Sequence, residues 1–298
     1  VFTSEALANE WTNAGGEGTW GAPATWQQVQ QYSEFLSGQE FDGEDMYGIL
    51  DVLARGGGVG SYFFFSRASA YAKHPDDPAF FFDPVDMTPK INSPAFVRAL
   101  DDMIAAAPWA PPDQTNADLL KTLGDFLAGY GSMAHWWADI GSNVYSNPGS
   151  IVQDKVGFSI LPGSPDVYNW ATSEWDTVTP SGAPGEMGAA NYAPYLAFLG
   201  WGLYAMTAAE ERGVSEAAWD LISHLTGKNI SMWMMVYPSG QNPWRKSHFN
   251  AAEWTTAGYP EAYAQQYLDS LLHSYEHPNR IVDMRIPGTG QYWILLED

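Results

Sequence analysis

Residues 126–141 read FLAGYGSMAHWWADIG and place two adjacent tryptophans, Trp136 and Trp137, shortly before Asp139. A segment that only packs against a core would normally bury one bulky ring and leave its neighbour polar. Two indoles side by side therefore indicate that one ring presents its flat face to a partner. The chain as a whole is rich in such rings, with 14 Trp, 16 Tyr and 14 Phe.

Composition limits the kinds of partner. The chain has 298 residues and 45% hydrophobic content, enough for one large domain or two modest lobes. Its 13 Lys and Arg against 35 Asp and Glu give a net charge of −22, which repels nucleic acid and anionic lipid surfaces. Cysteine is absent from the sequence, so there is no thiolate nucleophile, disulfide or Cys-ligated metal.

The ends and the apolar runs give no targeting signal. Residues 1–11, VFTSEALANEW, lack the basic and apolar regions of a signal peptide, and no run of about 18 apolar residues occurs. We expect a soluble chain whose export signal, if it has one, has been removed or lies upstream.

Two helix starts are marked by capping residues. Thr25 precedes Trp26 and is followed at capping-box spacing by Gln28, and Ser93 precedes Pro94, which suits the first position of a helix. The first helix is predicted to bury Trp26, Val29, Tyr32 and Leu36, and the second a stripe of Phe96, Val97, Leu100, Met103 and Ile104.

Other segments follow from periodicity and composition. Leucine spacing predicts a helix over 119–127, Ser215 predicts the start of another with Ala218, Leu221, Ile222 and Leu225 inward, and a long helix is predicted from about 261 to 275. Alternation in KVGFSILPG, residues 155–163, predicts a strand through Val156, Phe158 and Ile160, and residues 163–194 are predicted to form a long functional loop.

The order of these segments resembles the extracellular carbohydrate-binding proteins of bacterial ABC importers, the family similar to maltose-binding protein. Eight stretches carry the resemblance in the order of that family: PATWQQVQQYSEFL (23–36), MYGIL (46–50), INSPAFVRALDDMI (91–104), FLAGYGSMAHWWADIG (126–141), KVGFSILPG (155–163), APYLAFLGWGLYAM (193–206), SEAAWDLISHLTG (215–227) and YPSGQNPWRKSHF (237–249).

The resemblance implies a helix-rich, two-lobed α/β fold of the periplasmic-binding-protein type II class, closing on a sugar like a hinged trap. Residues 1–197 would form mainly the second lobe, 198–248 a hinge crossing and part of the first lobe, and 249–298 the return to the second lobe. Family members carry over a hundred residues ahead of the Thr-Trp segment and usually one more helix at the end. We therefore expect an incomplete chain that lacks the N-terminal half of the first lobe.

The implied function is reversible binding of a mono- or oligosaccharide or a polyol by a monomer, with no cofactor and no bond made or broken. The implied partners are the transmembrane permease subunits and an ATPase. The implied location is the periplasm, with or without a lipid anchor on the outer face of the membrane.

A sugar offers C–H faces and a rim of hydroxyls, so its site needs flat rings and planar polar groups. Trp137 matches the position where the family presents a stacking tryptophan, with Trp136 inward or beside it and Asp139 accepting from hydroxyls; the alternative is that both rings are core. The remaining candidates are Tyr62, Phe64 and Arg67 in GGGVGSYFFFSR, Trp201 in the crossing, Asn242 and Arg245 in SGQNPWR, and Trp170, Trp175 and Asp176 in the long loop.

Other functions have weaker support in the sequence. A glycosidase would also combine aromatic platforms with a carboxylate pair, but no motif singles out such a pair. The four aspartates Asp76, Asp77, Asp83 and Asp86 leave calcium binding open, although their spacing is not that of an EF-hand. His273 and His277 are four residues apart, as in half of a zinc site, but they lack the HExxH pattern. The sequence contains neither the GxSxG motif of a serine hydrolase nor a phosphate-binding glycine motif.

Overall fold

The computed structural model describes residues 4–41, 43–55, 59–179, 189–197, 204–237 and 241–297. In these ranges the helices are α1 (Glu5–Asn13), α2 (Trp26–Leu36), α3 (Gly60–Ala72), α4 (Pro94–Ala106), α5 (Leu119–Leu127), α6 (Ile140–Ser146), α7 (Tyr204–Glu211), α8 (Ser215–Leu225), α9 (Lys228–Val236), α10 (Ala251–Thr256), α11 (Glu261–Glu276) and α12 (Thr289–Glu297), and the 3-10 turns are η1 (Ala107–Trp109), η2 (Gln114–Asn116) and η3 (Lys246–Phe249). The strands are β1 (Glu40–Phe41), β2 (Glu44–Asp45), β3 (Tyr47–Leu50), β4 (Gly131–Ala134), β5 (Asp166–Asn169), β6 (Glu174–Thr177), β7 (Tyr195–Leu196) and β8 (Ile281–Val282).

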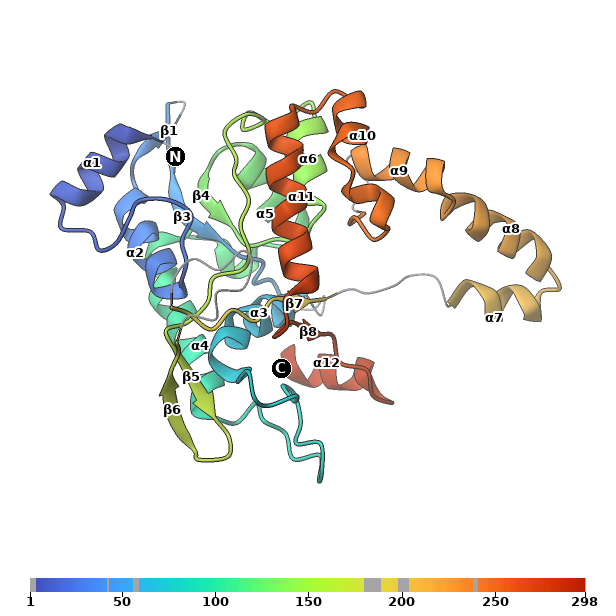
Figure 1. Cartoon of the computed structure of the whole chain (residues 1–298), viewed down its shortest axis with the longest axis horizontal. Helices are drawn as coiled ribbons and strands as arrows, with labels where there is room; N and C mark the ends of the chain where they lie inside the picture. The colour runs from blue at the N-terminus through green and yellow to red at the C-terminus, as the bar shows by residue number, and fades with distance from the viewer. Residues whose placement is uncertain are drawn as a thin grey trace.

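Short strand pairs connect distant parts of the chain (Figure 1). β3 and β4 are parallel, with Leu50 opposite Ala134, and β7 and β8 are parallel, with Tyr195 opposite Ile281. Because parallel strands end at the same edge, the residues that follow β3 and β4 are brought together. This edge is where the candidate site lies.

The predicted helix after Thr25 is confirmed. The Thr25 hydroxyl accepts a hydrogen bond from the Gln28 N–H at 3.2 Å, while the Gln28 side chain accepts from the Ala24 N–H at 2.7 Å. All four residues of its predicted stripe are buried. The long helix predicted at 261–275 is also confirmed as α11, with Tyr267 and Leu268 buried.

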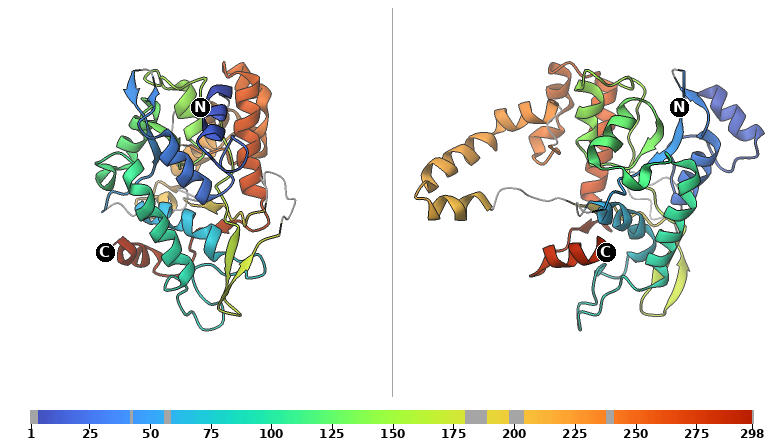
Figure 2. Two further views of the ribbon diagram at one scale, coloured as in Figure 1. Left: turned by 90° about the vertical axis from the view of Figure 1, so that its left-hand side faces the viewer. Right: turned by 180° about the vertical axis from the view of Figure 1, so that it is seen from behind.

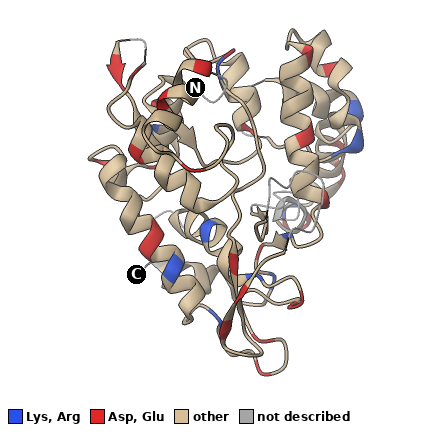
Figure 3. Ribbon diagram, turned by 60° about the vertical axis from the view of Figure 1, so that its left-hand side comes forward, with Lys and Arg blue, Asp and Glu red and all other residues tan. Residues whose placement is uncertain are grey.

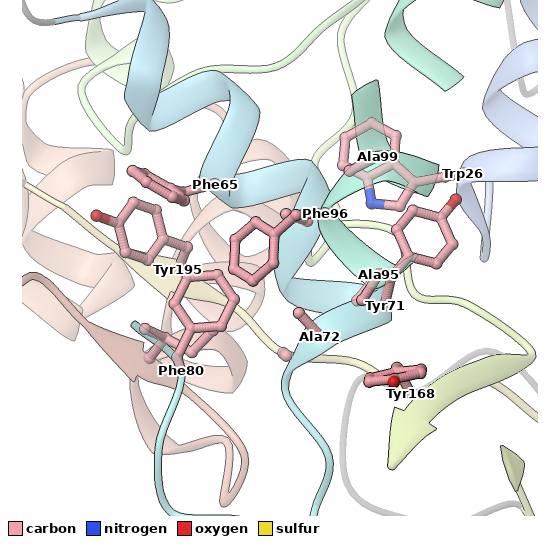
Figure 4. Packing of buried hydrophobic residues seen from close by; sticks show 14 of the residues in the cluster. Trp26, Phe65, Tyr71, Ala72, Phe80, Ala95, Phe96, Ala99, Tyr168 and Tyr195 are labelled. Atoms are coloured by element: carbon pink, nitrogen blue, oxygen red, sulfur yellow. The ribbon is translucent and has the colours of Figure 1, made fainter. Parts of the chain in front are cut away.

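α3 runs through the centre of one core and is buried over most of its length. It packs against α4, and Figure 4 shows Phe65 from α3 near Phe96 from α4. A second core surrounds Trp254 of α10, whose indole N–H donates to the His248 carbonyl at 2.7 Å. The two cores flank the β3–β4 edge.

The strand predicted over 156–160 is wrong. These residues adopt no regular secondary structure, although Ile160 is buried and Phe158 packs edge-on against Tyr263 and Tyr267 at 5.2 Å between ring centroids. Alternating burial arises here from side-chain packing alone. A strand also needs a neighbouring strand to bond with, and periodicity does not reveal whether one is present.

The long loop predicted at 163–194 contains a hairpin. β5 and β6 pair antiparallel, with Tyr168 opposite Trp175 and their ring centroids 5.6 Å apart. Cross-strand aromatic pairs stabilise such ribbons, which the Gly- and Pro-rich composition of the wider segment concealed.

Of the two apolar stripes predicted on α4 and α8, Phe96 on α4 is the one residue that is buried. α4 buries Ala95, Phe96 and Ala99, whereas Val97, Leu100 and Ile104 are 53%, 49% and 62% exposed. α8 buries none of its residues, and Leu221 and Leu225 are 59% and 41% exposed. With α7 and α9, α8 forms an arm that extends from the body in Figures 1 and 2.

Acidic residues occur on many elements, and basic residues are few (Figure 3). Of the four aspartates considered for calcium, Asp83 and Asp86 accept from backbone N–H groups two residues on, and Asp77 pairs with Lys90. Within the described ranges no group of three or more His, Cys, Asp or Glu side chains could hold a metal ion. None of the helices in those ranges combines the length and apolarity needed to cross a bilayer.

Candidate functional site

A cavity of about 1690 Å³ lies at the edge where β4 ends. The segment between β4 and α6, residues 135–139, lines it, and Asn242 joins it from the stretch before η3. Trp136, Trp137, Asp139 and Asn242 were each predicted from sequence, and the structure brings them to one cavity. Pockets for small ligands are typically smaller, about 300–1,000 Å³, so there is room for a ligand with several hydroxyls.

Hydrogen bonds from α11 hold the cavity segment in place. The Tyr267 hydroxyl donates to the Ala138 carbonyl at 2.6 Å, and the Tyr263 hydroxyl donates to the Gly141 carbonyl at 2.8 Å. Gly141 is required at its position, because a Cβ there would lie 2.4 Å from the Tyr267 ring. The Asp139 N–H donates to the Asn242 side-chain oxygen at 2.8 Å, which joins this segment to the second cavity-lining stretch.

Trp137 is half-buried and surrounded by rings set edge-on. Its centroid lies 5.3 Å from that of Phe63, 5.8 Å from that of Trp136 and 6.3 Å from that of Tyr62, with interplanar angles of 86°, 84° and 72°. None of these three neighbours stacks on the indole face. These steeply angled contacts hold the ring in place, and the residue lines the cavity.

Asp139 supplies the carboxylate of this wall. Burial raises its pKa to about 6, although its own backbone N–H, the Trp136 indole and the Asn143 side chain favour the charged form. The Asn143 amide donates to Asp139 Oδ2 at 3.0 Å. A half-buried carboxylate that is largely charged at neutral pH can accept hydrogen bonds from ligand hydroxyls.

We expect Asp139→Asn to stabilise the protein at pH 8 by about 1–3 kcal/mol, in keeping with a carboxyl pKa raised by burial. The folded-state pKa of Asp139, about 6, exceeds the ordinary value of 3.8. The contribution of protonated Asp139 to the free energy of unfolding is therefore fully present below pH 3.8 and is lost as pH rises through 6. Urea unfolding of parent and variant at pH 8 and pH 4 measures the difference in the free energy of unfolding, and we expect the variant to be more stable at pH 8 only.

Asp154→Asn is the matched control, since Asp154 also lines the cavity but is exposed. Its free energy of unfolding should change by less than about 0.5 kcal/mol. An Asp139→Asn variant that gains nothing at pH 8 would show that the carboxylate is not desolvated.

Three other predicted residues lie on α3 and do not line the cavity. Tyr62 packs against Trp137 and Trp293, and its ring centroid lies 4.7 Å from that of Trp293. Phe64 packs against Phe65 and Phe96. Arg67 is 1% exposed and is engaged in an ion pair. The chain therefore buries this guanidinium instead of presenting it to the cavity.

The remaining predicted residues are dispersed. Arg245 does not itself line the cavity, but it donates to the Thr226 carbonyl at 2.9 Å and covers the Trp244 ring, and both of these residues do line it. In the hairpin, Trp175 is 39% exposed, Trp170 lies 4.9 Å from the Lys90 ammonium, and Asp176 accepts from Asn169 at 2.7 Å. Trp201 lies outside the described residues.

Sequence reasoning missed His135 and Trp293. His135 immediately precedes the tryptophan pair and lines the cavity, so its position next to Trp136 was a usable signal. Trp293, on α12, contacts Tyr62 only through the tertiary fold. Nothing in its local sequence links the two residues.

Comparison with known proteins identifies the architecture. No protein-family model matches the chain, and no curated protein matches it by sequence. Among solved structures it is similar to maltose-bound MalE3 of T. maritima, with a TM-score of 0.62, 17% identity, and coverage of 97% of this chain and 62% of that one. The chain has the fold of an ABC transporter solute-binding protein.

Two further structures agree. An ABC transporter solute-binding protein of Agrobacterium vitis S4 with bound D-mannitol has a TM-score of 0.56 at 17% identity, covering 97% of this chain and 62% of that one. One from Agrobacterium radiobacter K84 in complex with ribitol has a TM-score of 0.54 at 18% identity, with 97% and 67% covered. The predicted fold class, the helix-rich type II periplasmic-binding-protein fold, is confirmed, and this chain spans about two thirds of these proteins' length.

Proposed function

We propose that this protein is the substrate-binding subunit of a bacterial ABC importer and binds a sugar or polyol reversibly in the cavity beside β4. The observation that carries the proposal is the juxtaposition of Trp137 and Asp139 in one cavity wall. The proteins of similar fold described above are bound to maltose, D-mannitol and ribitol, which supports a polyhydroxylated ligand.

The chemistry of the wall suits such a ligand. An indole face packs against the C–H face of a sugar or the carbon chain of a polyol, excluding water from apolar surface. The Asp139 carboxylate accepts hydrogen bonds from hydroxyls, and the Asn242 amide adds a planar donor. None of these three groups would form a covalent bond to the ligand, so the ligand would be released unchanged.

A glycosidase is the competing proposal. Such an enzyme uses two carboxyl groups on either side of the scissile bond. Among the described residues, the Asp and Glu side chains that line the cavity are Asp139, half-buried, and Asp154, exposed. The similar structures are those of binding proteins, which favours capture over cleavage.

The wider assignment follows from the proposed role. The protein would act as a monomer outside the cytoplasmic membrane, in the periplasm or lipid-anchored, and deliver its ligand to permease subunits driven by an ATPase. Residues 1–197 and 249–298 would belong mainly to one lobe and 198–248 to the crossing and the other lobe. Ligand binding would shift the lobes toward a closed population.

Isothermal titration calorimetry with maltose, D-mannitol and ribitol tests the proposal. We expect saturable binding of at least one, accompanied by a change in tryptophan fluorescence because Trp137 lies in the wall. Chromatography of the recovered ligand should show it intact. Binding of no sugar or polyol, or cleavage of a glycoside that disappears in Asp139→Asn, would refute the proposal.

A further inference from the structure

Three charged or titratable side chains meet at the cavity wall, where His135 lines the cavity and the other two do not. Asp51 follows the last residue of β3 and His135 follows the last residue of β4, so the parallel register places them side by side. His135 Nδ1 lies 3.1 Å from Asp51 Oδ1. Arg67, on α3, donates from its guanidinium to Asp51 Oδ2 at 3.0 Å.

This cluster is almost removed from solvent. Asp51, Arg67 and His135 are 4%, 1% and 8% exposed. The Trp26 ring lies 4.3 Å from the Arg67 guanidinium and 5.5 Å from the His135 ring. Taking charges out of water costs free energy that the ion pair only partly recovers, so packing alone does not explain why a charged cluster occupies this position.

The partners of Asp51 determine which nitrogen of His135 carries the proton. Burial would raise the pKa of Asp51, but Arg67 and His135 outweigh it and the pKa is lowered, so the carboxylate is charged at neutral pH. A charged carboxylate only accepts, and Nδ1 must therefore carry a proton. In the neutral ring, Nε2 is then an acceptor.

His135 lines the same cavity as Trp137 and Asp139. Its ring contacts Trp26 and Phe63, the latter with centroids 4.8 Å apart, and Phe63 also touches Trp137. Within the described part of the chain, Nδ1 makes the hydrogen bond of this ring and Nε2 makes none. The side chain is thus nine-tenths buried, held by a hydrogen bond and two ring contacts, and left with one unused acceptor in a residue that lines the cavity.

We propose that His135 is a further ligand contact, whose Nε2 accepts a hydrogen bond from one hydroxyl of the bound sugar or polyol, with Asp51 and Arg67 as positioning residues. This inference rests on the proposed function, since it adds a specificity-determining residue to the same site. A fixed acceptor discriminates strongly, because a ligand without the matching hydroxyl leaves a buried polar group unpaired.

Calorimetry on His135→Phe provides the first test, with the ligand among maltose, D-mannitol and ribitol that binds. We expect the affinity to fall about tenfold or more, the effect of removing one buried hydrogen bond. His224→Phe, at an exposed position of α8, is the matched control and should bind as the parent does. Circular dichroism and urea unfolding establish that both variants are folded.

Singly deoxygenated analogues of that ligand separate contact from structural support. One analogue should lose affinity for the parent protein but bind His135→Phe no more weakly than the complete ligand does, because the two changes remove the same bond. Equal losses from every deoxygenation in both proteins would overturn the proposal.

Nitrogen NMR of the ¹⁵N-histidine-labelled parent protein needs no substitution and decides the case if His135→Phe does not fold. We expect His135 to be protonated at Nδ1 without ligand and its Nε2 resonance to shift at saturation. A proton on Nε2, or an Nε2 resonance unmoved by bound ligand, would refute this contact and leave the proposed function standing. Failure of the parent to bind any of the three ligands would instead refute the proposed function, and this inference with it.

Discussion

Trp137→Ala is expected to weaken sugar or polyol binding by about 1–3 kcal/mol, or roughly 5- to 150-fold in Kd, as for a desolvated aromatic contact. The ring lines the cavity, and Phe63, Trp136 and Tyr62 meet it at steep angles, so removing it takes away a preorganised stacking surface. Isothermal titration calorimetry at neutral pH measures the change.

Trp175→Ala is the matched control for this substitution. Trp175 is 39% exposed on the β5–β6 hairpin and does not line the cavity, so its removal should leave the ligand affinity within about twofold, the scale of ordinary surface changes. A folded Trp137→Ala variant that binds as tightly as the parent would exclude the indole from the site.

Arg67→Met is expected to lower the free energy of unfolding by about 3–5 kcal/mol at pH 7, the usual cost of leaving one buried charge without its partner. Asp51 would remain buried and charged next to His135. Urea denaturation followed by circular dichroism gives the value. Arg98→Met is the control, because the Arg98–Asp102 pair is 38% and 25% exposed and should contribute at most about 1 kcal/mol.

The loss of unfolding free energy in Arg67→Met should depend on pH. The folded-state pKa of Asp51 is lowered, so the stability it contributes is present above its unfolded value near 3.8 and is lost as pH falls through the folded value. Without Arg67, this contribution is reduced, and the difference between parent and variant should shrink toward pH 3. Asp51→Asn combined with Arg67→Met should recover part of the loss; a double variant no more stable than Arg67→Met would contradict the buried-charge explanation.

Capping residues and apolar spacing made the helices predictable, but they did not show which parts of the fold cover each helix. Thr25 and the spacing of Trp26, Val29, Tyr32 and Leu36 depend on neighbours within a few residues, and the structure confirms each of these four as buried. Periodicity on α4 and α8 correctly indicated helices but not what covers them. An apolar stripe shows that a residue can be buried, whereas its burial depends on another part of the fold.

The site was predictable where its residues are close in sequence. Trp136, Trp137 and Asp139 enter the cavity together because one short segment after β4 carries them. Arg67 was wrongly expected at the ligand, because its partner could not be identified from sequence: Asp51 follows a four-residue strand, β3, whose pairing with β4 spans more than eighty positions. Such short strands have too little pattern to specify register, so the cluster of Asp51, Arg67 and His135 emerges only from the fold.

A crystal structure of the protein with whichever of maltose, D-mannitol or ribitol binds tests the central claim most directly. We predict an unaltered ligand in the cavity beside β4, with its C–H face against the Trp137 indole and a hydroxyl within hydrogen-bonding distance of the Asp139 carboxylate. Density for the ligand at a different surface, or for a cleaved product in this cavity, would contradict the account.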